Sequence, residues 1–295
     1  MTIQHHQNNR KGIFFLLIAV AAFSTMDAMA KSLVTTYPAP QLVFVRFLGQ
    51  LLAVVVILRQ NLPGAIRTSY PLLHVFRSIF QFGATLFFFL SLTYIGLTEA
   101  TAIADISPML ITLGAALFLN EKLTPARVVG VVMSSVGALI VIRPGTDVFT
   151  PAAILPLICA LSYAASALLT RFIGPKESAW SSMFYASVFG TIVASFSLPF
   201  VWTPIAQADL WRFVVLGVLG TAAQLALIRA FSVAEAAAIA PYSYTGVLFA
   251  STYSLIFFGT LPDRLTLLGI VVIVAAGLYV WSREASQTGA RDEGR

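Results

Sequence analysis

Long apolar runs separated by short polar segments dominate this chain. Most runs are long enough to cross the hydrocarbon core of a bilayer as a helix, which takes about 20 residues. The alternating pattern of a membrane-spanning barrel is not visible. The pattern therefore predicts an all-α integral membrane protein with ten transmembrane helices. The spans are expected at residues 12–33, 41–58, 72–92, 98–119, 127–142, 151–170, 179–201, 210–231, 234–259 and 265–281.

Two stretches far apart in the chain resemble each other. The nonapeptides 99–107 (EATAIADIS) and 235–243 (EAAAIAPYS) agree at six positions, and each is followed by an apolar helix, a short turn and a glycine. Such self-similarity indicates an internal duplication. Because each copy would hold five spans, an odd number, the copies are expected to be inverted repeats. The expected domains are an N-terminal tail at 1–11, repeats at 12–145 and 151–282, and a disordered C-terminal tail at 283–295.

Composition and charge sharpen this picture. The 295 residues are 58% hydrophobic and 10% charged, whereas soluble domains carry about 25% charged residues. A net charge of +6 would suggest a nucleic-acid partner in a soluble protein, but these cations lie in short segments between apolar runs. With the N-terminus inside, twelve of the eighteen Lys and Arg residues lie on the cytoplasmic side and four outside. This bias places both termini in the cytoplasm and gives no reason to expect nucleic acid.

The start of the chain also resembles a secretory signal. Arg10 and Lys11 precede the first apolar run, and residues 28–30 (AMA) look like a cleavage site. Asp27 directly before this motif, and the loss of one span from the first repeat, argue against cleavage. The single cysteine, Cys159, is interpreted as a small core residue. We expect no catalytic residues, no metal site and no cofactor.

Ionisable residues inside the predicted spans mark a candidate path for a solute. They are Asp27, Arg46, Arg77 and Asp105, each costing roughly 2.5–3.5 kcal/mol at the centre of a membrane helix unless it pairs or lines water. Arg46 and Arg77 suit a carboxylate or phosphate-like group, since a guanidinium offers a planar fork of donors. Asp27 or Asp105 could carry a coupling proton; the alternative is a structural ion pair with Arg46. Lys31 is expected to snorkel or to pair with Asp27.

Four polar residues on other spans are expected to line the same path: Gln81, Tyr163, Gln224 and Tyr242. Each has polar neighbours on its own helix face at the spacing of helical turns. These neighbours are His74, Arg77 and Thr85 for Gln81, Ser166 and Thr170 for Tyr163, Thr221 for Gln224, and Thr245 for Tyr242. The alternative role of such residues is hydrogen bonding between helices. His74, at a helix start, is expected at the membrane interface.

Prolines and glycines recur at related places in the two repeats. Pro108 and Pro241 fall inside the fourth and ninth spans, where a lost backbone hydrogen bond can bend a helix toward a cavity. Small residues let membrane helices pack closely. The glycines taken as packing points are Gly130, Gly137, Gly269 and Gly277.

Several of these stretches resemble the drug/metabolite transporter superfamily, in its ten-helix EamA-type branch. They are YIGLTEATAIADISP, LNEKLTPARVVG, GALIVIRPG, APYSY, FGTLP and, in the first span, MDAMAKSLV. The resemblance covers about residues 11–283. It implies a carrier of the bacterial inner membrane with a central cavity lined by spans 1, 3, 4, 6, 8 and 9. Thr260 departs from the pattern, which usually has Glu there, and is interpreted as a loop cap.

The expected function is secondary transport of a small polar organic metabolite by alternating access. The resemblance suggests riboflavin, S-adenosylmethionine or an amino-acid-like solute, and the expected partners are this solute and the lipid bilayer. A scaffold or sensor without transport remains an alternative. An intramembrane enzyme is a weaker one, because no HExxH or GxSxG motif occurs. No GxxxxGK[ST] motif is present either, which disfavours direct use of ATP.

Overall fold

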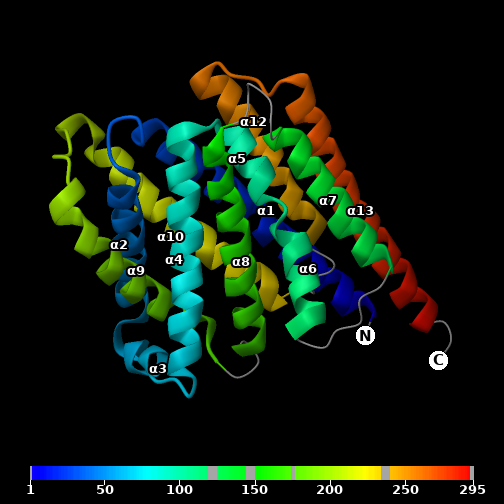
Figure 1. The fold of residues 1–295 in the computed structure, drawn as a ribbon. Helices are drawn as coiled ribbons and strands as arrows, with labels where there is room; N and C mark the ends of the chain where they lie inside the picture. The colour runs from blue at the N-terminus through cyan, green and yellow to red at the C-terminus, as the bar shows by residue number, and fades with distance from the viewer. Residues whose placement is uncertain (1, 119–124, 144–149, 174–176, 234–239, 293–295) are drawn as a thin grey trace.

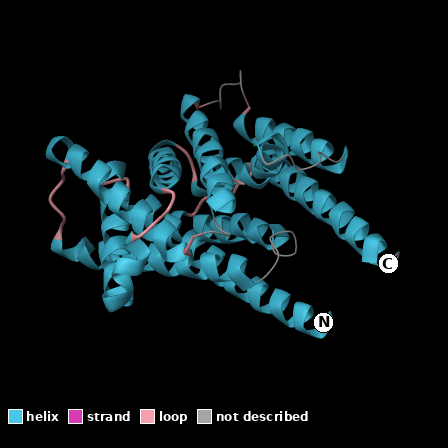
Figure 2. Cartoon of the chain, turned by 90° about the horizontal axis from the view of Figure 1, so that it is seen from below, coloured by secondary structure: helices cyan, strands magenta, loops and turns pink. Residues whose placement is uncertain are grey.

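The computed structural model describes residues 2–118, 125–143, 150–173, 177–233 and 240–292. Every secondary-structure element in these residues is a helix, as predicted, and Figure 2 shows helices joined by loops. The first half comprises α1 (Thr2–Leu33), α2 (Ala39–Leu58), η1 (Arg59–Asn61), α3 (Leu62–Ile66), α4 (Pro71–Tyr94), α5 (Leu97–Ala104), α6 (Ser107–Phe118) and α7 (Pro125–Ile142). The second comprises η2 (Pro151–Ala153), α8 (Ile154–Ile173), α9 (Ala179–Val201), η3 (Gln207–Asp209), α10 (Leu210–Val233), η4 (Ala240–Tyr244), α12 (Thr245–Phe258) and α13 (Arg264–Asp292).

Seven of the described helices are long and apolar enough to cross a membrane. They lie in α1, α2, α4, α8 with the η2 turn before it, α9, α10 with the η3 turn before it, and α13. The apolar helix at Val128–Ile142, within α7, is shorter. The predicted span 98–119 is divided between α5 and α6, and its last residue lies outside the described part of the chain. Of the predicted span 234–259, residues 234–239 lie outside it as well, and η4 and α12 form most of the rest.

The division of the fourth span falls where its proline predicts. Residues 105 and 106 form a turn between α5 and α6, and Pro108 lies at the start of α6. Pro108 has no N–H to donate to the carbonyl of Ala104, so the helical hydrogen-bond ladder is interrupted there. Pro241 lies in η4, a 3₁₀ helix that leads into α12. Both prolines therefore mark irregular backbone in related places of the two halves.

The terminal helices extend beyond the predicted spans. α1 begins at Thr2, so the tail at 1–11 is helical from its second residue. α13 continues to Asp292, so residues 283–292 of the tail that was expected to be disordered are helical, and residues 293–295 lie outside the described residues. The tail contains no proline and several good helix formers, Ala, Glu, Gln and Arg, so the helix continues past its apolar part.

Helices of the first half pack chiefly on helices of the second. The main contacts pair α1 with α10, α2 with α9, α4 with α8 and α7 with α13. In Figure 1, α7 and α13 form one edge of the bundle, α2 and α9 lie toward the other, and α4 and α8 stand between them. The pair α7–α13 is antiparallel, because Gly130 lies against Val280 whereas Gly137, further along α7, lies against Ile273.

Glycines allow this pair of helices to approach closely. A Cβ on Gly137 would lie 2.9 Å from the Gly269 carbonyl oxygen, and a Cβ on Gly269 would lie 2.7 Å from that of Gly137. Gly130 and Gly277 likewise leave no room for a methyl group, Gly277 because the Tyr244 ring packs on it. All four glycines predicted as packing points are therefore packing points.

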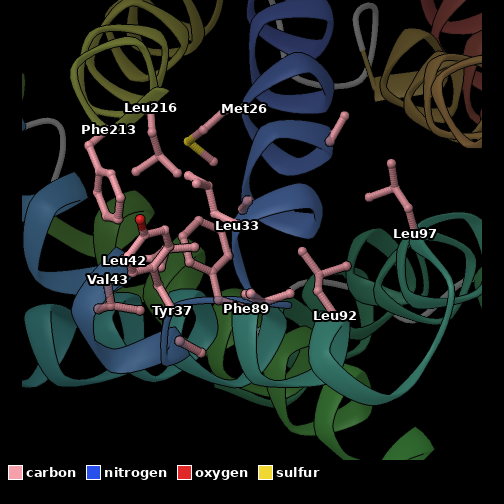
Figure 3. Close-up of a cluster of buried hydrophobic side chains, with 14 of the residues drawn as sticks. Met26, Leu33, Tyr37, Leu42, Val43, Phe89, Leu92, Leu97, Phe213 and Leu216 are labelled. Atoms are coloured by element: carbon pink, nitrogen blue, oxygen red, sulfur yellow. The ribbon is translucent and has the colours of Figure 1, made fainter. Parts of the chain in front are cut away.

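The largest buried apolar cluster joins α1, α2, α4 and α10. Figure 3 shows its members from these helices, among them Leu33, Leu42, Phe89 and Leu216. Each of these four side chains is almost fully buried. The cluster fixes the helices that carry the charged residues described next.

Candidate solute pathway

Polar side chains of α4 and α8 meet along the contact between the two helices. Gln81 Oε1 on α4 accepts a hydrogen bond from Ser166 Oγ at 3.2 Å. Arg77 Nε donates to Thr170 Oγ1 at 2.6 Å, and Thr170 in turn donates to the Ser166 carbonyl at 2.7 Å. The polar faces predicted on these two helices therefore lie against each other.

Arg77 links three helices. Besides Thr170 on α8, its guanidinium donates through Nη1 to the carbonyl of Ser182 on α9 at 2.9 Å. The side chain is buried, and Tyr163 of α8 lies within its electrostatic reach. These contacts show how Arg77 is accommodated inside the helix bundle; its binding of a solute anion stays a prediction.

Arg46 of α2 retains an unused donor. Its Nη1 donates a hydrogen bond to Thr85 Oγ1 on α4. Thr85 Oγ1 in turn donates a hydrogen bond to the Gln81 carbonyl at 3.1 Å. Its Nε is buried without a hydrogen-bond partner, although the residue is only 5% exposed. Gly220 of α10 leaves space for the arginine stem, since a Cβ there would lie 3.4 Å from Arg46 Nε. Buried N–H groups are rarely left unpaired, so this donor is available to a ligand.

Asp27 of α1 has Arg46 as its charged neighbour. The two side chains lie within electrostatic reach, but no hydrogen bond or ion pair of Asp27 is found among the described residues. Asp27 lies deep among protein atoms while part of its surface stays accessible. Lys31 does not pair with it, because Lys31 Nζ donates at 2.7 Å to both the Leu92 and Ile95 carbonyls at the end of α4.

Asp105 lies in the turn between α5 and α6. Its Oδ2 is buried and has no hydrogen-bond partner. The carboxyl acts electrostatically on Cys159 and Tyr163 of α8 and on Tyr244 of η4. Asp27 and Arg46 also act on Cys159, so the three charged residues are arranged around one point of α8.

Two predicted residues make no hydrogen bond to this group among the described residues. Tyr242 packs on the apolar cluster of Leu16 and Ala230, and its carbonyl accepts from Thr245 Oγ1 at 2.6 Å. Gln224 is half-buried on α10, and no hydrogen bond joins it to the other candidates within the described residues. The structure thus links Arg46, Gln81 and Arg77 by hydrogen bonds and brings Asp27, Asp105 and Tyr163 near them, while Gln224 and Tyr242 are not hydrogen-bonded to the group.

One cluster near the start of α4 was only partly predicted. His74 lies in the first turn, as expected, but it is fully buried and stacks on Tyr185 of α9 at 5.0 Å. Its Nε2 lies 3.9 Å from Glu177 Oε2. Glu177 Oε1 accepts from the Ser69 N–H at 2.8 Å and from Thr68 Oγ1 at 2.9 Å. The Ser69 N–H, helped by Thr68, holds the pKa of Glu177 below its ordinary value.

The helical spacing of polar residues could not indicate Glu177. It lies just before α9, outside any apolar run, and its partners come from a loop more than a hundred residues earlier. A single acid close before a helix N-terminus was the available signal, since such a residue interacts favourably with the helix dipole.

Membrane-length helices that enclose linked charged side chains define a class of protein, the multi-pass solute transporter. A comparison with family models agrees. The model of the EamA-like transporter family matches residues 10–143 and 150–282, and the chain belongs to this family. It is therefore a membrane transporter of small metabolites.

Curated relatives of known name are similar over almost the whole chain. An S-adenosylmethionine uptake transporter of Rickettsia prowazekii (strain Madrid E) is 27% identical and covers 96% of each chain. The pseudopaline exporter CntI of Pseudomonas aeruginosa (strain UCBPP-PA14) is 28% identical, covering 90% of this chain and 94% of its own. A riboflavin transporter of Rhizobium johnstonii is 27% identical, covering 92% and 91%. Similar sequences thus serve both uptake and export.

Proposed function

We propose that this protein is a secondary transporter that moves a small polar organic metabolite across the inner membrane of a bacterium. The observation that carries the proposal is the unpartnered Nε of Arg46, buried inside a helix bundle beside Asp27. An anion and a cation of one solute would both find partners there. Riboflavin, S-adenosylmethionine and amino-acid-like compounds are the candidates, and the names of the relatives support the first two.

The proposed architecture has ten transmembrane helices in two inverted repeats, at 12–145 and 151–282. Two separate matches to one family model support the duplication. The packing supports a two-fold relation, because it is unchanged when the halves are exchanged. The fourth span, α5 with α6, and the ninth span, η4 with α12, are each counted as one unit. When each helix is replaced by its counterpart in the other half, the contact of α1 with α10 becomes that of α8 with α4, and the contact of α1 with α12 becomes that of α8 with α6. The contacts α2–α9 and α7–α13 each become themselves.

The same contacts support alternating access. One group of helices consists of α8 with α4 and α6, and the other of α1 with α10 and α12. The seams α2–α9 and α7–α13 connect the halves toward the two edges of the bundle (Figure 1). Rocking of one group against the other about these seams would open the interior to each side in turn.

In this proposal each site residue has a role. Arg46 binds the anionic group of the solute through Nε, and Thr85 and Gln81 hold its guanidinium in place. The Asp27 carboxylate balances the positive charge of Arg46 when the site is empty. When the solute is bound, Asp27 attracts its cationic group. Arg77 of α4 and Tyr163 of α8 continue the path along the contact of these two helices, and Gln224 and Tyr242 are proposed to line it as well.

Orientation follows from the distribution of Lys and Arg. We place both termini in the cytoplasm, and this is supported by Figures 1 and 2, where the start of α1 and the end of α13 lie at the same end of the bundle. An even number of spans requires termini on the same side.

Purified protein in liposomes tests the function. Saturable flux is expected for at least one of radiolabelled S-adenosylmethionine, riboflavin and a mixture of amino acids. Arg46→Ala should abolish it, because the buried donor is lost. Arg67→Ala, which removes an exposed arginine from a loop, is the matched control and should transport normally. Absence of flux for all these solutes, with helical content intact, would favour the scaffold or sensor instead.

A further inference from the structure

We propose that Asp105 is the proton-binding group of this carrier and that Asp27 stays ionised. The inference rests on the proposed function, since a bound proton drives nothing without transport. The sequence leaves open which of the two intramembrane acids, Asp27 or Asp105, carries a coupling proton. The proposal assigns this role to Asp105. The assignment follows from what surrounds each carboxyl group.

The two acids differ in their charged neighbours. Asp27 lies within electrostatic reach of Arg46, although no ion pair joins the two, and a nearby opposite charge favours the ionised form of a carboxyl. No positive charge acts on Asp105 among the described residues, and its Oδ2 lacks a hydrogen-bond donor. An unpaired carboxylate inside the membrane costs far more free energy than a neutral carboxyl does. Asp105 is therefore the acid that gains by taking up a proton.

The groups within electrostatic reach of Asp105 are neutral thiol and phenol side chains, apart from the distant charges named above. Tyr244 of η4 lies within its reach, and the Tyr244 hydroxyl is itself buried without a hydrogen-bond partner. Cys159 and Tyr163 approach from α8. Pro108 leaves the carbonyl of Ala104, next to Asp105 in the chain, without its helical donor. Ala102 and Ile103, near the end of α5, belong to a buried apolar cluster with residues of α7, η2, α12 and α13.

Several charged residues that the structure describes on the neighbouring helices are engaged elsewhere. On α4, Arg77 donates to Thr170 and Ser182. On α1, Lys31 caps α4, and the Glu99 carboxyl of α5 acts on Lys31. Arg143, at the end of α7, donates to Asp263 just before α13. α12 contains no charged residue.

The position of Asp105 couples its proton to movement. α5 packs on α8, which belongs to one of the two proposed rocking groups, and on α12, which belongs to the other. Rocking must therefore change the surroundings of the turn that follows α5. A water-borne proton would add to a carboxylate oxygen of Asp105 while one side is open, forming an O–H bond. The same bond would break to release the proton to water on the other side.

Infrared spectroscopy of the full-length protein in lipid tests proton binding without any solute. The wild type should show the C=O stretch of a protonated carboxyl that disappears as the pH is raised. Asp27→Asn should keep this band, Asp105→Asn should lose it, and Asp105→Glu should restore it at a shifted frequency. The proposal is overturned if the wild type lacks the band or if Asp105→Asn retains it.

A flux measurement separates this proposal from the proposed function. With whichever solute the liposome assay finds, a pH gradient should drive accumulation by the wild type. Asp105→Asn should lose accumulation but still exchange internal for external solute, because only coupling is removed. Solute flux that ignores the pH gradient in the wild type would contradict the proton site while leaving the transporter in place. A complete lack of flux would instead contradict the transporter, and the infrared result would still decide whether Asp105 binds a proton.

Discussion

At the scale of single residues, Arg46 depends on one hydroxyl. Thr85 Oγ1 is the acceptor for Arg46 Nη1, and Thr85→Val keeps the shape of the side chain while removing that acceptor. A buried hydrogen bond to a charged group contributes about 1.5–3 kcal/mol. We expect Thr85→Val to lower thermal stability by that order and to weaken solute affinity, as measured by the concentration dependence of flux.

A matched control exists on α12. Thr252 is exposed, and its Oγ1 donates only to the Leu248 carbonyl of its own helix. Thr252→Val should leave both stability and affinity near those of the wild type. Equal effects of the two substitutions would mean that Thr85 does not position Arg46.

The Glu177 cluster makes stability depend on pH. Because hydrogen bonds from Ser69 and Thr68 lower the pKa of Glu177 in the folded protein, its carboxylate stabilises the fold above the pKa of the unfolded state. This contribution is lost as pH falls through the lowered folded pKa. The unfolding temperature of the wild type should therefore decrease more steeply on acidification than the unfolding temperature of Glu177→Gln. Parallel curves for the two proteins would argue against the role of this carboxylate.

Some of the pathway could be predicted from residue spacing and some could not. Helical periodicity placed Gln81 and Arg77 on one face of α4, and the structure joins that face to α8. Spacing within one helix says nothing about contacts between helices far apart in the chain. The contact between Arg46 and Thr85 joins different spans, so helical spacing could not predict it. The predicted pairing of Lys31 with Asp27 was wrong, because Lys31 donates to carbonyls at the end of α4 instead.

At the scale of helices, the seam between α7 and α13 depends on glycine. A Cβ on Gly137 would lie 2.7 Å from Ile273 Cγ1 and 2.9 Å from the Gly269 carbonyl. The backbones must therefore separate to admit even a methyl group. Overpacking of this kind costs typically about 1–3 kcal/mol, so Gly137→Ala should lower the unfolding temperature in detergent.

The control for this substitution is Gly64 in α3. Nothing lies within 4 Å of a Cβ placed there, and alanine favours a helix over glycine. Gly64→Ala should be neutral or slightly stabilising. If Gly137→Ala unfolds no earlier than Gly64→Ala, the close approach of α7 and α13 does not contribute to stability.

Helix existence was easier to predict than helix length. Hydropathy located the apolar segments, yet a run of apolar residues does not show whether its backbone is continuous. The turn at residues 105–106 required attention to Pro108, and even then the proline predicted a bend rather than two helices, α5 and α6. At the C-terminus the predicted helix was too short, because polar residues after Trp281 continue α13 without interruption.

At the scale of the whole molecule, two loop contacts suggest how the halves are related. Tyr37 follows the end of α1 by four residues, and its hydroxyl donates to Asp209, just before α10, at 2.8 Å. Glu177 follows the end of α8 by the same interval and is bound by Ser69, just before α4. Exchanging the halves converts one contact into the other. If the repeats are inverted, these two contacts must lie at opposite faces of the membrane.

Labelling from one side of the membrane tests this relation. Thr35 and Ser178 are exposed residues in the two corresponding loops, and the single Cys159 is buried, so Cys159→Ser gives a suitable background. In intact cells a membrane-impermeant maleimide should label Thr35→Cys at once and Ser178→Cys only after the cells are opened. This outcome is expected because an odd number of spans separates the loops in an inverted repeat, and the excess of Lys and Arg places the second loop inside. Labelling of both cysteines from the same side would mean that the halves are related without inversion, and the proposed alternating access would lose its symmetry.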